Sequence, residues 1–122
     1  MRARFIPCCT ALAVLATLSL VPAIFADPSG GAISGVARAP AGGATVHTVV
    51  YRGGEQADFS IQGDGDTTLN IIVKDANGFE IARTRGPGDR CHVAWRPATT
   101  GVFQIYVVNE GGVYNQYNWR AY

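Results

Sequence analysis

The sequence predicts an all-β protein, and specifically an antiparallel β-sandwich of about seven to eight strands. From residue 45 onward, short runs of β-branched and aromatic residues alternate with polar residues. Turn residues rich in Gly, Asp and Asn separate these runs at intervals of about ten residues, which is typical of sandwiches and barrels. No apolar pattern with a spacing of three and four residues extends far enough to predict a helix.

Residues 1–26 have the pattern of a secretory signal peptide. Arg2 and Arg4 precede an almost wholly apolar run at residues 11–25, and Ala26 precedes Asp27. A basic start, an apolar run and a small residue before a polar one are the marks of a cleaved export signal. The alternative is an uncleaved membrane anchor, but the run is shorter than the roughly 20 residues of a spanning helix. We expect cleavage after Ala26 and no membrane insertion afterwards.

Residues 27–44 are rich in Gly, Ala, Pro and Ser, a composition that predicts a flexible leader. A short edge strand at residues 33–36 is an alternative. Residues 45–122 then form one predicted β-sandwich domain. We expect strands at residues 45–52, 56–62, 68–75, 79–84, 91–96, 101–109 and 114–121.

Period-two alternation assigns one face of each predicted strand to the core. The Asn77-Gly78 pair predicts a tight hairpin turn between two of the strands. The side chains expected to point inward are Val49, Phe59, Ile61, Leu69, Ile71, Val73, Phe79, Ile81, Val93, Trp95, Phe103, Ile105 and Val107.

The charge and cysteine content of the mature chain exclude several function classes. Eight basic and nine acidic residues follow Ala26, which gives a net charge of −1 without a block of like charge. Nucleic acid and anionic membrane surfaces are therefore poor partners. Cys91 is the one cysteine after the cleavage point, so no disulfide can form within the mature chain. We expect Cys91 to be buried and inert, although an intermolecular bridge is an alternative.

An ordered set of segments resembles the bacterial pre-peptidase C-terminal domain family. The segments are GDGDTTLNIIVKDANG at residues 63–78, Asp89 with Cys91, residues 95–97, TGVF at 100–103, VVN at 107–109 and VYNQY at 113–117. The resemblance covers residues 45–122. It implies a secreted, jelly-roll-like sandwich of the kind commonly attached to exported peptidases, and we expect this chain to be a stand-alone member.

The resemblance also raises the question of calcium. The family's third strand commonly reads DTDLDLYVYD, and some members bind calcium. Asp66 and Asp75 match the carboxylates at the two ends of that pattern, whereas Thr68 and Asn70 replace the intervening ones. Calcium takes six to eight oxygen ligands, so Asp64, Asp66 and Asp75 are weak candidate ligands. The alternative is that Asp64 and Asp66 shape a turn through bonds to the backbone.

The sequence contains no recognisable catalytic motif, so we do not expect an enzyme. Ser60 lies within a predicted strand, and alternation places Cys91 and His92 on opposite faces. Aromatic residues do gather near the C-terminus, and they are the candidate binding surface: Tyr114, Tyr117, Trp119 and Tyr122. Aromatic rings flanked by amides can stack on sugars or anchor a protein partner, but half of them are expected to cover the core. Ile72, Tyr106 and Val108 form a second candidate patch on the face opposite the core set.

Together these features predict a secreted or periplasmic bacterial accessory or interaction module. Its expected partner is an unidentified extracellular protein, an envelope component or a polysaccharide. A small carbohydrate-binding protein that uses the C-terminal aromatics is the alternative. No cofactor is expected apart from the calcium considered above.

Overall fold

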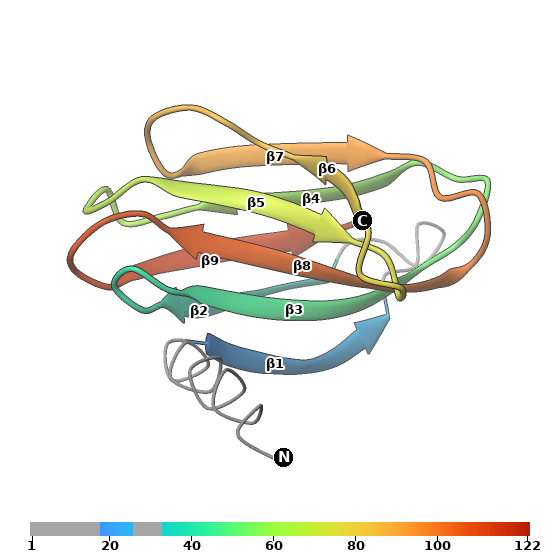
Figure 1. The fold of residues 1–122 in the computed structure, drawn as a ribbon, viewed down its shortest axis with the longest axis horizontal. Helices are drawn as coiled ribbons and strands as arrows, with labels where there is room; N and C mark the ends of the chain where they lie inside the picture. The colour runs from blue at the N-terminus through green and yellow to red at the C-terminus, as the bar shows by residue number, and fades with distance from the viewer. Residues whose placement is uncertain (1–17, 26–32) are drawn as a thin grey trace, which may run out of the picture.

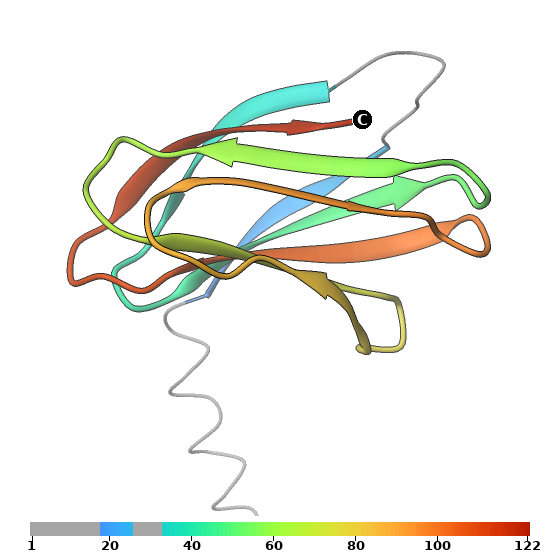
Figure 2. The same ribbon diagram turned by 90° about the horizontal axis from the view of Figure 1, so that it is seen from above.

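The computed structural model describes residues 18–25 and 33–122, which form two β-sheets packed face to face (Figures 1 and 2). The described strands are β1 (Leu18–Phe25), β2 (Ile33–Ala39), β3 (Ala44–Tyr51), β4 (Ala57–Gln62), β5 (Leu69–Lys74), β6 (Glu80–Arg83), β7 (Arg90–Trp95), β8 (Gly101–Asn109) and β9 (Asn115–Ala121).

The strand order is that of a jelly roll. One sheet runs β1-β3-β8-β5-β6 and the other runs β2-β9-β4-β7. From β2 onward, successive strands alternate between the two sheets, with the β5–β6 hairpin as the exception. Among the described strands, every pairing is antiparallel except that of β1 with β3. The predicted antiparallel β-sandwich is confirmed.

The core lies between the sheets and consists of inward-pointing side chains from both. Alternation along β8 buries every second residue, and in β5 it buries Leu69, Ile71 and Val73 beside the also buried Asn70. The buried hydrophobic cluster comprises Ala39, Val49, Tyr51, Ala57, Phe59, Ile61, Leu69, Ile71, Val73, Val93, Phe103, Ile105, Val107, Tyr117, Trp119 and Ala121.

The prediction of a flexible leader is wrong for residues 33–39, which form β2 at the edge of the four-stranded sheet. The small residues that suggested flexibility have a packing role. Gly35 lies opposite Trp119, and a Cβ atom on Gly35 would lie only 2.9 Å from the indole ring. Ile33 and Ala37 pack against the core on the same side. Residues 27–32 lie outside the described part of the chain.

The prediction that Phe79 and Ile81 face the core is also wrong. Their side chains are 68% and 44% exposed. In the pairing of β5 with β6, Ala82 lies opposite the buried Val73, so alternation turns its neighbour Ile81 away from the core, and Phe79 lies in the turn before β6. Ala82 packs against the core instead.

The predicted signal peptide includes β1, which pairs in parallel with β3 (Figure 1). The rest of that segment, residues 1–17 and residue 26, lies outside the described residues. No helix in the described part of the chain has the length and apolar character needed to cross a membrane.

Candidate binding site on the four-stranded sheet

The outer face of the four-stranded sheet carries a dense group of polar side chains. Alternation buries Phe59 and Ile61 of β4, so Ser60 and Gln62 point away from the core. The neighbouring strands β7 and β9 alternate in the same way. We call the resulting surface the polar face, and its members are Arg38, Asp58, Ser60, Gln62, Arg90, His92, Gln116, Asn118 and Arg120.

Strand pairing arranges six of these side chains in two rows across β7, β4 and β9. The first row is Arg90, Gln62 and Asn118, because Gln62 is paired with both of the other residues. The second row is His92, Ser60 and Arg120, with Ser60 at its centre. Directly opposed residues in antiparallel strands have Cβ atoms about 5 Å apart, so each row is close enough to contact one ligand.

All six side chains in the two rows can donate hydrogen bonds, and the rows contain no carboxylate. Arg90 and Arg120 occupy opposite corners, and neither forms an ion pair with any described residue. The guanidinium of Arg120 lies 5.4 Å from the centre of the Tyr122 ring. The two rows therefore form a positively charged, donor-rich surface.

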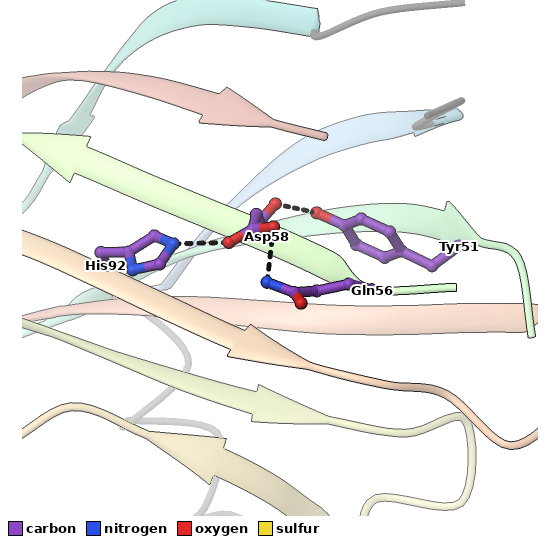
Figure 3. A network of polar contacts seen from close by, with 4 residues as sticks. All are labelled: Tyr51, Gln56, Asp58 and His92. Carbon is purple, nitrogen blue, oxygen red and sulfur yellow. Dashed lines mark hydrogen bonds and ion pairs between the residues drawn. The ribbon is translucent and has the colours of Figure 1, made fainter. Parts of the chain in front are cut away.

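Asp58 is the acidic member of the polar face and lies beside the second row. Its Oδ1 atom is 2.5 Å from Nε2 of His92, and Nε2 of Gln56 donates to its Oδ2 atom at 3.4 Å (Figure 3). The backbone carbonyl of Asp58 accepts a hydrogen bond from the Tyr51 hydroxyl at 2.8 Å. These contacts hold the Asp58 carboxylate against His92, and among the described residues it forms no ion pair with Arg90 or Arg120.

A shallow groove follows the two rows. Its volume is about 350 Å³, and it is lined by Ser60, Ile61, Gln62, Arg90, Cys91, His92, Asn118 and Arg120. A groove on a sheet surface fits an extended chain better than a compact small molecule, because it offers shallow contact along its length and little enclosure. The arrangement can bind an anionic, extended ligand.

Ser60, His92 and Asp58 share the polar face, an arrangement that the sequence analysis did not anticipate. Ser60 and His92 are directly paired across β4 and β7, and His92 contacts Asp58. Among the described residues, however, the structure records no hydrogen bond between the Ser60 hydroxyl and His92. An activated serine requires a base within hydrogen-bond reach, and this geometry does not provide one.

Cys91 projects from β7 toward the interior, opposite to His92. Its thiol donates a hydrogen bond to the carbonyl of Leu69 at 3.0 Å and is half-buried. Burial raises the pKa of the Cys91 thiol. The reactive thiolate is therefore disfavoured, in agreement with the expected inert cysteine.

Two of the four aromatic residues predicted to form a binding surface lie in the core. Tyr117 and Trp119 are 1% and 7% exposed, so they cannot stack on a ligand at the surface. Tyr114 and Tyr122 are exposed, but they flank opposite ends of β9. Each contacts an arginine, since Arg38 lies over Tyr114 and Arg120 over Tyr122. The four residues do not form one aromatic surface.

Tyr117 belongs to a buried polar pair that sequence reasoning missed. Its hydroxyl lies 2.6 Å from Nε2 of His47, and both side chains are almost completely buried. The rings of Phe59 and Trp119 surround His47 at centroid distances of 5.3 and 5.0 Å. Burial lowers the pKa of His47 to about 4, and among the described residues its Nδ1 atom has no hydrogen-bond partner. The imidazole is therefore neutral and structural at pH 7.

The three candidate calcium ligands do not converge. Asp64 and Asp66 lie in the β4–β5 loop, and Asp75 follows the other end of β5. Six residues of β5 separate the two positions, which corresponds to roughly 20 Å of extended strand. No group of three or more His, Cys, Asp or Glu side chains in the described part of the chain is placed to hold a metal ion.

The carboxylates of Asp64 and Asp75 each have a structural role. The Asp64 carboxylate accepts hydrogen bonds from the backbone of Asp66 and Gln116, and the Gln116 N–H lowers the pKa of Asp64. Asp75 accepts hydrogen bonds from the backbone of Asn77 and Phe79 within the β5–β6 turn. The geometry therefore supports the turn-shaping alternative for these carboxylates.

The strand order and the two-layer architecture define a β-sandwich of the pre-peptidase C-terminal type, which confirms the resemblance at the level of fold. Neither a known protein-family model nor a curated protein matches the chain. Solved structures with this fold include the pre-peptidase C-terminal domain of collagenase from Bacillus anthracis, at 14% identity and a TM-score of 0.53, covering 84% of this chain and 91% of that one.

Two further structures are similar. PliG of Aeromonas hydrophila, a periplasmic inhibitor of g-type lysozyme, has a TM-score of 0.60 at 13% identity and covers 85% of this chain and 96% of its own. CorA of Methylomicrobium album BG8, a surface-associated copper-binding protein, has a TM-score of 0.54 at 9% identity, with coverage of 86% and 98%. At these identities the similarity establishes the fold alone.

Proposed function

We propose that this chain is an exported, non-catalytic β-sandwich that binds an acidic segment of a partner protein across its polar face. The observation that carries the proposal is the pair of donor rows centred on Gln62 and Ser60. They present two arginines that form no ion pair with any described residue, together with four further side chains that can donate hydrogen bonds. Carboxylates accept such bonds, and bonds that involve charged partners are stronger than neutral ones.

An extended peptide fits the shape of this surface. The groove runs over three strands of a sheet and is shallow, and its lining residues come from neighbouring strands in register. Alternate side chains of an extended peptide point to the same side, so two acidic residues two positions apart could reach Arg90 and Arg120. Electrostatic complementarity of this kind favours fast association and selects the sign of the partner.

The similar structures support binding without catalysis as a use of this fold. PliG is named as an inhibitor of g-type lysozyme, so in that protein the sandwich acts on another protein. Both PliG and the surface-associated CorA work outside the cytoplasm. The basic, apolar N-terminal segment of this chain supports export to the same kind of compartment.

The test uses poly-L-glutamate as a defined acidic peptide. Retention of the protein on immobilised poly-L-glutamate is compared with retention on poly-L-lysine over a range of NaCl concentrations. We expect retention on poly-L-glutamate alone, weakening as salt rises because the contacts are solvent-exposed. The double variant Arg90→Glu/Arg120→Glu should weaken binding at least about tenfold.

A matched control carries the same charge change on the other sheet. Lys74 lies over the Tyr106 ring, and Arg85 is exposed in the β6–β7 loop. Lys74→Glu/Arg85→Glu therefore alters the net charge equally without touching the polar face. Equal loss of binding in both double variants would mean that net charge, and not the polar face, determines retention. Retention on alginate, a polyuronate, without retention on poly-L-glutamate would show that the ligand of the polar face is an acidic polysaccharide and not an acidic peptide.

A further inference from the structure

The two sheets protect their edges unequally. An exposed edge strand presents unpaired backbone groups, and proteins commonly guard it with shortness, charge, Gly or Pro. In the five-stranded sheet, β6 is only four residues long and carries Glu80 and Arg83. In the four-stranded sheet, β7 carries Arg90, and β2 contains Gly35 and Arg38. Three edges are therefore poor templates for a further strand.

The remaining edge is built on β3, whose sequence is ATVHTVVY. This strand is eight residues long, has five β-branched residues and contains no Asp, Glu, Lys, Arg, Gly or Pro. Its inner side chains join the core, and on its outer side Val46 is 1% exposed and Thr48 and Val50 are half-buried. Such a strand readily pairs with another if its edge is open.

In the full-length chain, β1 occupies this edge (Figure 1). The pairing extends from Leu18 opposite Ala44 to Phe25 opposite Val50, with a register irregularity between Val21 and Ile24. It is the one parallel pairing among the described strands. All of β1 lies before Ala26, the residue at which we expect the signal peptide to be cleaved. Cleavage would remove the strand that covers β3.

We propose that export opens the β3 edge and that β3 of a second copy of this chain then pairs with it, forming a closed dimer. The two β3 strands run antiparallel about a two-fold axis and join the two larger sheets into one. This inference rests on the export that the proposed function includes, because β1 must be cleaved off before the β3 edge opens. It does not depend on ligand binding at the polar face.

A second copy suits this edge for three reasons. Antiparallel self-pairing brings together two identical strands without charged residues, so no like charges face each other. It also continues the antiparallel pairing of β3 with β8. The interface is isologous, and the other edges are guarded, so assembly stops at two chains. The polar face belongs to the other sheet, so the dimer keeps two copies of it free.

The experiment follows the protein through export. The full chain, with its N-terminal segment, is expressed in a bacterial host, the exported form is purified, and intact mass identifies its first residue. Sedimentation equilibrium at micromolar concentrations should then give the mass of a dimer. Thr48→Lys places a charge at the centre of the β3 edge and should weaken the dimer at least about tenfold.

Gln104→Lys is the matched control. Gln104 lies on β8 between Thr48 of β3 and Lys74 of β5, within the sheet and away from the edge, so the variant adds the same charge beside the same strand. Because the new lysine lies opposite Lys74, the fold of this variant is checked by thermal unfolding. The variant should leave the dimer intact. Hydrogen exchange gives a readout independent of any variant, since every β3 amide should be protected in the dimer and those facing an open edge should exchange rapidly in a monomer.

Each remaining outcome counts against the dimer. A monomeric exported form with rapidly exchanging β3 amides would overturn it, as would an open series of larger oligomers. An exported form that retains residues 18–25 would overturn the opening of the edge, because β1 would remain in place. Equal effects of Thr48→Lys and Gln104→Lys would overturn the assignment of the interface to β3. Retention on poly-L-glutamate is measured separately, so failure of the dimer and failure of the polar face are distinguishable.

Discussion

The outer faces of the two sheets follow the same alternation but differ in chemistry. On the four-stranded sheet, Arg90, His92 and Arg120 are exposed and surround a shallow groove. On the five-stranded sheet the corresponding positions are largely apolar and at least half-buried, and we call them the apolar face: Val46, Val50, Ile72, Tyr106 and Val108. There, Lys74 extends over the Tyr106 ring at 4.8 Å from its centre.

This difference separates binding from stability. Exposed polar side chains gain little from the fold, so they remain available to a ligand. Half-buried apolar side chains lose contacts with water on folding and contribute to stability, at about 25 cal/mol per Å² of apolar surface removed from water. The sequence pattern of Ile72, Tyr106 and Val108 pointed to an apolar patch, and the structure shows these side chains half-buried.

The largest expected effect distinguishes the histidines of the two sheets. His47 lies in the core beneath the five-stranded sheet, and burial lowers its pKa from 6.5 to about 4. As the pH falls below 6.5, His47 binds a proton in the unfolded chain but not in the folded chain. The stability that depends on a neutral His47 is therefore complete above pH 6.5 and is lost as the pH falls toward 4. We expect the loss to reach about 3 kcal/mol, measured by denaturant unfolding at each pH.

Two variants isolate this effect from the titration of carboxylates. His47→Gln keeps a polar group beside Tyr117 but cannot be protonated, so the stability difference from the wild type should narrow as the pH falls. His92→Gln, which replaces the exposed histidine of the polar face, is measured alongside as the surface control. An unaltered slope in His47→Gln would assign the acid sensitivity to other groups.

The next effect compares two valines on opposite outer faces. Val46 is 1% exposed on the five-stranded sheet, and Val36 is 61% exposed on the four-stranded sheet. In the full-length chain, Val46→Ala should lower the free energy of unfolding by about 2 kcal/mol, because it removes buried methyl groups. Val36→Ala should change it by less than about 0.5 kcal/mol. Similar losses at both positions, measured by thermal unfolding, would remove the distinction between the faces.

A smaller effect tests the packing beneath the polar face. A Cβ atom on Gly35 would lie 2.9–3.0 Å from three atoms of the Trp119 indole ring. Because that ring is also packed against Phe59 and His47, Gly35→Ala should cost about 1–2 kcal/mol. Gly101→Ala is the control in strand β8, where a Cβ atom would meet no atom within 4 Å. Equal thermal stability of the two variants would show that the indole ring can shift freely.

The smallest expected effect is the response to calcium. The carboxylates of Asp64 and Asp75 already accept backbone hydrogen bonds, and the two residues lie beyond opposite ends of β5. We therefore expect the same melting temperature in excess calcium and in excess chelator. A calcium-dependent rise of about 10 °C, as expected for a ligand at a hundred times its dissociation constant, would contradict this prediction.

The strands were predictable from the sequence because alternation is a local property. The predicted runs agree with β3 to β9 within one or two residues, and the outward direction of the Ser60 and Gln62 side chains followed from the same pattern. The polar face was not predictable, because it requires β4 to lie between β7 and β9. Those strands are far apart along the chain, and local spacing carries no information on which strands become neighbours.

The errors have the same origin. The alternation of Phe79 and Ile81 was read correctly as local pattern, but the pairing of Ala82 with Val73 turned Ala82, and not Ile81, toward the core. Likewise, the small residues of β2 suggested flexibility, but Gly35 is small because the Trp119 indole ring occupies the space above it. The predicted aromatic surface was divided because period two buried Tyr117 and Trp119 while Tyr114 and Tyr122 remained exposed at the two ends of β9.

The sequence by itself determined the β class, the strand boundaries and most of the core, because side-chain alternation and turn chemistry act over a few residues. The tertiary structure alone decided which polar residues share a face, which carboxylates stay apart, and that His47 is surrounded by aromatic rings. The physical reason is that strand order and register are set by burial across the whole sandwich, and each depends on segments separated by many residues.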